Sequence, residues 1–295
     1  MSKRGTQMTR FRSPADVTER LAAVKYLADE HVAVTVYLAD QLEKPILCEG
    51  PAGVGKTELA KAIAAITGHR LTRLQCYEGL DEAKALYEWN YKKQLLRIQA
   101  DSGARDWHAV EHDIFTEEFL LSRPLLAAIR SPDPVVLLID EVDRVEVETE
   151  ALLLEVLSEW QVSIPELGTI AATRSPLVVL TSNNTRELSE ALKRRCLFLH
   201  MDYPDVEREI RIIRARIPGI DAMFADQVAR VVRSIRALDL KKAPSVSETL
   251  DWARTLLLLG VEKIDADVTR KTLALLLKYQ QDIARVSAEL AVKDA

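Results

Sequence analysis

One short segment of the chain has the residue types and spacing of a phosphate-binding loop. It reads Gly50-Pro51-Ala52-Gly53-Val54-Gly55-Lys56-Thr57 and matches G-x-x-x-x-G-K-[ST] in full. Glycine backbones curl closely enough to aim N–H groups at phosphate oxygens, and the following helix points its N-terminal dipole at the same anion. We expect Lys56 to reach the β and γ phosphates and the Thr57 hydroxyl to ligate Mg²⁺. A chance glycine turn is the alternative interpretation.

Two acids at the end of a predicted buried strand supply the second part of this site. Asp140 and Glu141 follow Val135–Ile139, a run of β-branched and leucine residues typical of a central parallel strand. Because the carboxyl ends of such strands face the ligand crevice, we expect both acids beside the phosphates. Asp140 would hold Mg²⁺, and Glu141 would polarise the attacking water as a general base. The alternative is a pair of solvated acids.

Further polar side chains are candidates for the same chemistry. Asn183 follows the apolar strand Leu177–Leu180, where an amide would orient the hydrolytic water; Asn184 and an ordinary loop asparagine are the alternatives. Arg194 and Arg195 end a predicted helix, where basic residues also suit the helix C-terminus electrostatically. The second interpretation makes Arg195 an arginine finger, which stabilises charge on a neighbour's γ-phosphoryl group and requires a ring of subunits.

The elements that position these residues alternate between helix and strand as far as Pro204. Helices are predicted over 15–42, 56–66, 149–160 and 187–194, and strands over 46–48, 71–76, 135–139, 177–180 and 196–200. A hairpin is predicted over 162–173 around Gly168, and residues 78–130 read as mostly helical. This alternation predicts a three-layer α/β sandwich with a parallel sheet.

After Pro204 the strand patterns cease. Amphipathic helices are predicted over 205–217, 221–237, 245–260 and 266–290. We therefore expect an α/β core at residues 1–203 and a small all-helical lid domain at residues 204–295.

Composition excludes several classes of protein. The 295 residues are 48% hydrophobic, which excludes a disordered chain. No apolar run approaches the ~20 residues needed to cross a bilayer. Three single cysteines without pairing or metal spacing suit a reducing, cytoplasmic location. The net charge of −5 argues against nucleic acid as the main substrate.

Two short patterns have competing interpretations. Lys3, Arg4, Arg10 and Arg12 precede no apolar segment, so we expect a solvated basic tail rather than a secretory signal. Weak peripheral attraction to anionic lipid is the alternative. The segment His108-Ala109-Val110-Glu111-His112 fits the zinc pattern H-x-x-E-H, but no third ligand stands out downstream, which favours a helix-surface pair.

Several of these motifs together resemble the MoxR branch of AAA+ ATPases. The resemblance rests on the phosphate loop, Asp140-Glu141, Thr181-Ser182-Asn183 and Ala191–Cys196, and it covers about residues 15–260. More narrowly, three segments look like the CoxD type, the ATPase associated with carbon monoxide dehydrogenase. These segments are Cys76–Asp81, Tyr87–Tyr91 and Ala243–Trp252.

The resemblance implies a hexameric, chaperone-like ATPase that uses Mg·ATP to help mature a metalloenzyme. For the CoxD type the client is the molybdenum–copper carbon monoxide dehydrogenase, whose sulfur- and copper-containing site must be assembled. A partner with a von Willebrand factor A domain is also implied. Residues 78–110 would be an insert in helix 2, and residues 162–173 the hairpin before the sensor-1 strand. The alternatives are a clamp-loader or helicase subunit and a scaffold that binds ATP without hydrolysing it.

One segment departs from the MoxR pattern. Many members place an arginine, called sensor 2, where this chain has Ser245. Either Lys241, Lys242 or Arg254 takes its place, or the lid senses the γ-phosphate weakly.

Overall fold

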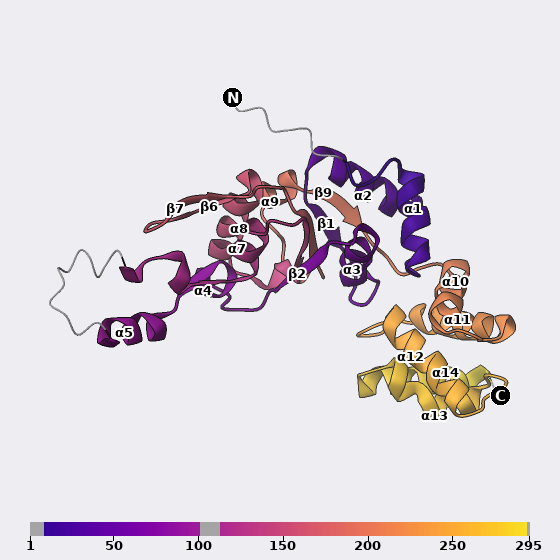
Figure 1. Ribbon diagram of the computed structural model, residues 1–295. Helices are drawn as coiled ribbons and strands as arrows, with labels where there is room; N and C mark the ends of the chain where they lie inside the picture. Colours follow the sequence, from indigo (N-terminus) through magenta and orange to yellow (C-terminus); the bar gives the residue numbers. More distant parts are fainter. Residues whose placement is uncertain (1–8, 101–112, 294–295) are drawn as a thin grey trace. The chain divides into compact units, whose positions relative to one another are not determined.

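The computed structural model describes residues 9–100 and 113–293, which form two compact units (Figure 1). The first unit consists of the chain up to Val17, Glu30–Glu49 and Thr57–Leu199. The second consists of Thr18–Asp29, Gly50–Lys56 and the chain from His200 onward. The second unit thus differs from the expected lid of residues 204–295. It also contains two segments from earlier in the chain, and one of them is most of the phosphate loop.

A five-stranded sheet forms the centre of the first unit, in the order β2-β5-β8-β1-β9. The strands are β1 Ile46–Glu49, β2 Arg70–Gln75, β5 Val135–Asp140, β8 Leu177–Ser182 and β9 Leu197–His200. The pairs β2–β5, β5–β8 and β8–β1 are parallel. Every residue of β5 and β8 is buried, which explains their unbroken apolar runs. The predicted α/β fold with a parallel sheet is confirmed.

Helices surround this sheet in the first unit. They are α2 Glu30–Leu42, α3 Lys56–Thr67, α7 Pro124–Ile129, α8 Val147–Glu159 and α9 Glu190–Arg195. Helix α7 packs against β2 and β5, and α2 packs against β1. The one-turn 3-10 helix η2 (Val142–Arg144) follows β5 and contacts β8. The chain therefore turns at the carboxyl end of β5, where the predicted acids stand.

The predicted single helix over 15–42 is wrong. Helix α1 (Pro14–Ala23) ends early, and α2 begins only at Glu30. Lys25 has a φ of 61°, and the N–H of Tyr26 bonds the carbonyl of Leu21 at 3.0 Å. A residue in the left-handed region closes a helix in this way, although lysine carries no sequence signal for it.

The tail interpretation of Arg10 is also wrong. Its guanidinium and backbone N–H both donate to the buried carboxylate of Asp40, at 2.8 and 2.7 Å. This ion pair ties the start of the described chain to α2, so Arg10 belongs to the folded first unit. Lys3 and Arg4 lie outside the described residues.

Residues 78–130 contain a strand pair where mostly helix is predicted. The segment contains α4 Glu82–Ala85, β3 Tyr87–Trp89, α5 Tyr91–Ala100, η1 Glu117–Phe119 and β4 Leu120–Ser122 before α7. β3 and β4 are antiparallel, with Trp89 opposite Leu120. Trp89 is buried and meets Phe115 edge-to-face at 5.1 Å between ring centroids. Aromatic burial outweighs helix propensity here. The zinc-like pattern at 108–112 lies outside the described residues.

The predicted hairpin around Gly168 is present. It consists of β6 Gln161–Ile164 and β7 Gly168–Ala171, paired antiparallel with Ile164 opposite Gly168. Gly168 has a φ of 77°, a conformation that glycine adopts at no steric cost.

The second unit is dominated by helices. They are α10 Val206–Arg216, α11 Ala222–Arg236, α12 Val246–Leu258, α13 Ala266–Leu276 and α14 Gln280–Lys293. Trp252 is fully buried in their core, and its indole N–H donates to Thr272 Oγ1 at 2.8 Å. Arg236 and Glu209, both buried, form a two-pronged ion pair at 2.7 and 2.9 Å.

The predicted single helix over 266–290 is divided into α13 and α14. Leu277 is extended, with φ −115° and ψ 140°, and both Leu276 and Leu277 are buried. Lys278 Nζ then donates to the carbonyls of Ala274 and Leu275, which the ending helix leaves open. Burial of two adjacent leucines thus decides the break. Within residues 9–100 and 113–293, no helix is long and apolar enough to cross a membrane.

Candidate functional site

The predicted phosphate loop folds back on its own lysine. Lys56 Nζ donates to the carbonyl oxygens of Gly50 at 2.5 Å and Pro51 at 2.7 Å, and the residue is only 6% exposed. Gly53 has a φ of 76°, and a Cβ there would lie 2.3 Å from Cβ of Ser245. Only glycine fits this position. The carbonyls of Gly50 and Pro51 thus hold the Lys56 side chain inside the loop that is predicted to bind phosphate.

The next residue in the chain, Thr57, meets the predicted metal-binding acid. Thr57 Oγ1 donates to Oδ1 of Asp140 at 3.0 Å. Asp140 is the last residue of β5 and is 3% exposed. Thr181 Oγ1 donates to the same oxygen at 2.5 Å, and Arg73 Nη2 donates to Oδ2 at 2.6 Å. Hydroxyl and carboxylate oxygens are ligands that Mg²⁺ prefers, so Thr57 and Asp140 fit a magnesium ion.

Glu141 stands at the turn that follows β5. Its φ of 58° is left-handed, and its N–H donates to Thr181 Oγ1 at 2.9 Å. The side chain is one-third exposed and pairs with Nε of Arg144, with its Oε2 at 2.6 Å. A strained backbone at a strand end is a feature that functional sites often contain. The backbone of Glu141 is thus fixed by its hydrogen bond to Thr181, while its carboxylate can release the exposed side chain of Arg144.

A family comparison covers this part of the chain. Residues 45–196 match the model of the family described as "AAA domain (dynein-related subfamily)". The match contains the whole phosphate loop and Asp140-Glu141, and it spans more than half of the chain. The chain belongs to this family. It is therefore a member of the AAA+ ATPases, and this membership supports ATP hydrolysis.

Individual relatives of this AAA+ protein are distant. The gas vesicle ATPase GvpN of Haloferax mediterranei is 24% identical over 204 residues, which are 65% of this chain and 56% of GvpN. An uncharacterised protein of Staphylococcus haemolyticus is 23% identical over 247 residues, covering 80% of this chain and 87% of that protein.

The solved structures show the same fold. A point mutant of Thermotoga maritima RuvB matches with a TM-score of 0.51 at 19% identity, over 90% of this chain and 72% of that one. At this identity the likeness concerns the fold and no more.

The predicted sensor asparagine of the AAA+ protein lies in a turn held by a buried acid. Asp143 Oδ2 accepts the N–H groups of Asn183 at 3.2 Å and Thr185 at 2.9 Å, and the Thr185 hydroxyl at 2.6 Å. Burial by itself would raise the pKa of Asp143, but the hydrogen bonds from Thr185 and Asn183 outweigh it and lower the pKa. Asp143 therefore stays ionised and fixes the turn after β8.

The two candidate finger arginines lie in the last turn of α9. Arg195 Nε donates to Ser158 Oγ at 2.5 Å, and its Nη1 donates to the carbonyl of Ala191 at 3.3 Å. Arg194 is exposed. The N-cap Ser189 starts this helix by accepting from the N–H of Leu192, which places its beginning later than predicted. Both side chains remain solvent-accessible, as an arginine that acts on another subunit must be.

The position expected to hold sensor 2 has a structural role in the second unit. Ser245 caps α12 in a reciprocal capping box with Glu248, and the N–H of Val246 donates to the carbonyl of Gly53 at 3.2 Å. The three suggested substitutes have other partners. Lys242 pairs with Glu248, Arg254 with Asp251, and Lys241 lies over the ring of Tyr279. The cap thus fixes the phosphate loop through backbone contact.

The three cysteines are buried and suit packing rather than chemistry. Burial raises the pKa of Cys76 to about 12, and the charges of Asp140 and Asp143 add to the shift. Burial also raises the pKa of Cys196 to about 12. Protonated thiols are poor nucleophiles and poor metal ligands, so neither side chain suits sulfur or copper transfer.

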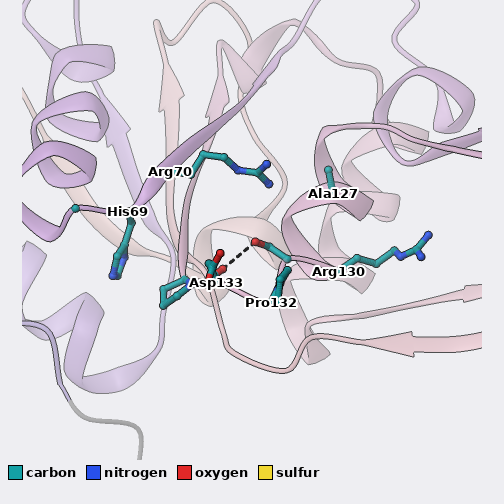
Figure 2. Close-up of a pocket in the computed structure, with 9 residues that line it drawn as sticks. His69, Arg70, Ala127, Arg130, Pro132 and Asp133 are labelled. Carbon is teal, nitrogen blue, oxygen red and sulfur yellow. Dashed lines mark hydrogen bonds between the residues drawn. The ribbon is translucent and has the colours of Figure 1, made fainter.

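A pocket of about 690 Å³ lies at the other end of the sheet (Figure 2). Among its lining residues, Arg70 begins β2, Arg130 caps the end of α7, and Asp133 shortly precedes β5. None of the predicted site residues lines it. The candidate site is therefore defined by chemistry at the carboxyl end of β5 and not by this cavity.

No motif in the sequence marks Arg73, Asp143 or Arg144 as part of the site. Each contacts a predicted site residue in the structure. Asp143 and Arg144 lie within three or fewer residues of the acids, so proximity in the chain is a signal for them. Arg73 comes from a separate strand, and only strand pairing brings it to Asp140.

Proposed function

We propose that this AAA+ protein binds Mg·ATP with Gly50–Thr57 and hydrolyses it with Asp140 and Glu141. The observation that supports this most is the 3.0 Å hydrogen bond between Thr57 and Asp140. It joins the end of the phosphate loop motif to the end of β5 across more than eighty residues of sequence. Thr57 and Asp140, each predicted from its own motif to bind Mg²⁺, are thus in direct contact.

Each residue has a defined role in the proposal. Lys56 binds the β and γ phosphates, while Thr57 and Asp140 hold Mg²⁺, which when bound neutralises charge on the phosphate oxygens. Glu141 first separates from its ion-pair partner Arg144 and then accepts a proton from the attacking water. Asn183 orients that water from the turn that Asp143 fixes.

We further propose that Arg195 acts on the ATP of a neighbouring subunit, within a homo-hexamer. Arg195→Ala is expected to spare ATP binding and to lower turnover about 10³-fold, because the charge it meets develops in the transition state. Mixing Arg195→Ala with Glu141→Gln protein should restore part of the activity. In a mixed ring, the intact Glu141 of one subunit meets the intact Arg195 of the next.

Phosphate release measured on the separate and mixed variants tests this assignment. Arg174→Ala, which removes an exposed arginine of the first unit outside α9, is the control and should retain turnover. If the mixture releases phosphate no faster than the sum of the two separate variants, Arg195 has a structural role within its own subunit.

The client proposed for this ATPase is a metalloenzyme, the molybdenum–copper carbon monoxide dehydrogenase. We also propose that the ATPase acts together with a partner protein that carries a von Willebrand factor A domain. The support is the resemblance of the segments around Trp89 and Trp252 to the MoxR branch and its CoxD type. Both tryptophans are buried, so these segments support the architecture of that type more than any client contact. The name of GvpN supports the ATPase class.

The client is tested on the dehydrogenase itself. We expect enzyme purified from cells that carry Glu141→Gln to contain severalfold less copper and cyanide-releasable sulfur than enzyme from wild-type cells. Cells carrying Glu148→Gln, an exposed change on α8, serve as the control. A fully loaded dehydrogenase in all three strains would contradict this client. ATP turnover stimulated by DNA would instead favour the clamp-loader or helicase class.

A further inference from the structure

The proposed function leaves one partner of the Asp140 carboxylate without a role. Arg73 lies on β2, the edge strand beside β5, and donates from Nη2 to Oδ2 at 2.6 Å. The other oxygen, Oδ1, accepts the hydroxyls of Thr57 and Thr181. Arg73 thus brings a full positive charge to a carboxylate whose burial would otherwise make its negative charge costly.

Arg73 is free to leave this position. Its side chain is 49% exposed, whereas that of Asp140 is 4% exposed. The register of β2 places Gln75 opposite Asp140, and Arg73 reaches the carboxylate from two residues back along the same face of the strand. Gln75 Oε1 accepts from the same Nη2. The guanidinium therefore approaches from solvent and can withdraw without a change in the backbone.

We propose that Arg73 is a positioning residue that takes the place of the metal cation in the nucleotide-free site. It balances the charge of Asp140 and keeps Oδ1 directed at Thr57, and it leaves Oδ2 when Mg·ATP binds. This inference rests on the proposed function. Because two cations beside one carboxylate repel each other, the Arg73–Asp140 pair opposes magnesium binding. Arg73 therefore raises the free Mg²⁺ concentration at which the protein binds ATP.

The test is a titration of free Mg²⁺ at a fixed concentration of a fluorescent ATP analogue, with binding rather than turnover as the readout. In Arg73→Gln protein, the half-saturating Mg²⁺ concentration should fall about tenfold, equivalent to ~1.4 kcal/mol. Arg73→Lys keeps the charge on a shorter, more strongly hydrated group, so its decrease should be about threefold. Without nucleotide, Arg73→Gln should also melt at a lower temperature than wild type.

Arg123→Gln is the matched control. Arg123 pairs with Glu88 at the same 2.6 Å, and both side chains are 40% exposed, but this pair joins β3 to the residue before α7. Its loss should leave the magnesium midpoint unchanged.

The outcomes separate the inference from the function on which it rests. An unchanged or higher magnesium midpoint in folded Arg73→Gln protein overturns the inference. Weaker ATP binding at saturating Mg²⁺ also overturns it, because Arg73 would then contact the phosphates. If Arg73→Gln does not fold, an unchanged midpoint in Arg73→Lys overturns it. Wild-type protein that binds no ATP at any Mg²⁺ concentration overturns the proposed function itself.

Discussion

Replacement of Glu141 by glutamine is expected to lower ATP turnover about 10³-fold, within the range that a general base contributes. Glutamine keeps the shape of the side chain but cannot accept the proton of the attacking water. Binding of ATP should persist, because Lys56, Thr57 and Asp140 are unchanged. Steady-state phosphate release and calorimetric titration of ATP measure the two effects separately.

Glu148→Gln is the control for this change. It makes the same substitution at an exposed position in the first turn of α8. A Glu141→Gln protein that turns over ATP as fast as this control would remove Glu141 from the reaction. Absence of turnover in the wild type itself, with ATP bound, would favour the non-hydrolysing scaffold.

Replacement of Lys56 by alanine is expected to weaken ATP binding at least ~100-fold. Removing one partner of a buried charge pair costs ~2–5 kcal/mol, and about 1.4 kcal/mol corresponds to a factor of ten. The Lys56 side chain is buried beside the loop carbonyls of Gly50 and Pro51, and in the proposal its ammonium binds the β and γ phosphates. Calorimetric titration with ATP in the presence of Mg²⁺ measures the loss.

Lys61→Ala provides the comparison on the same helix. Lys61 is half exposed on α3 and pairs with Glu58 at 2.7 Å. Its removal should leave ATP affinity and melting temperature nearly unchanged, because an exposed ion pair contributes ~0–1 kcal/mol. If the two alanine variants bind ATP equally, the phosphate loop has been assigned to the wrong segment.

Local pattern was sufficient for most of the sheet. Val135–Ile139 and Leu177–Leu180 are continuous apolar runs because β5 and β8 are buried on both faces. The hairpin around Gly168, with φ of 77°, follows from glycine's backbone freedom. Each of these features has its cause within a few residues of sequence, so each was predictable.

The elements that were predicted wrongly have a different cause in common. The break at Lys25, the β3–β4 pair and the break at Leu277 carry neither glycine nor proline. They arise because distant packing overrides local helix propensity, as in the burial of Trp89 against Phe115. No pattern within one window of sequence contains that information.

Residue types and their spacing were enough to predict the residues of the proposed chemistry: a phosphate loop, two acids after a strand, and an asparagine after the next. Their types and spacing suffice because phosphate and magnesium demand particular donors. The partners of these residues could be found only from the folded chain. Arg73 reaches Asp140 across a strand pair, Asp143 holds the turn of Asn183, and Ser245 packs on Gly53. Such contacts depend on strand order and packing between segments far apart in the chain, which no local spacing encodes.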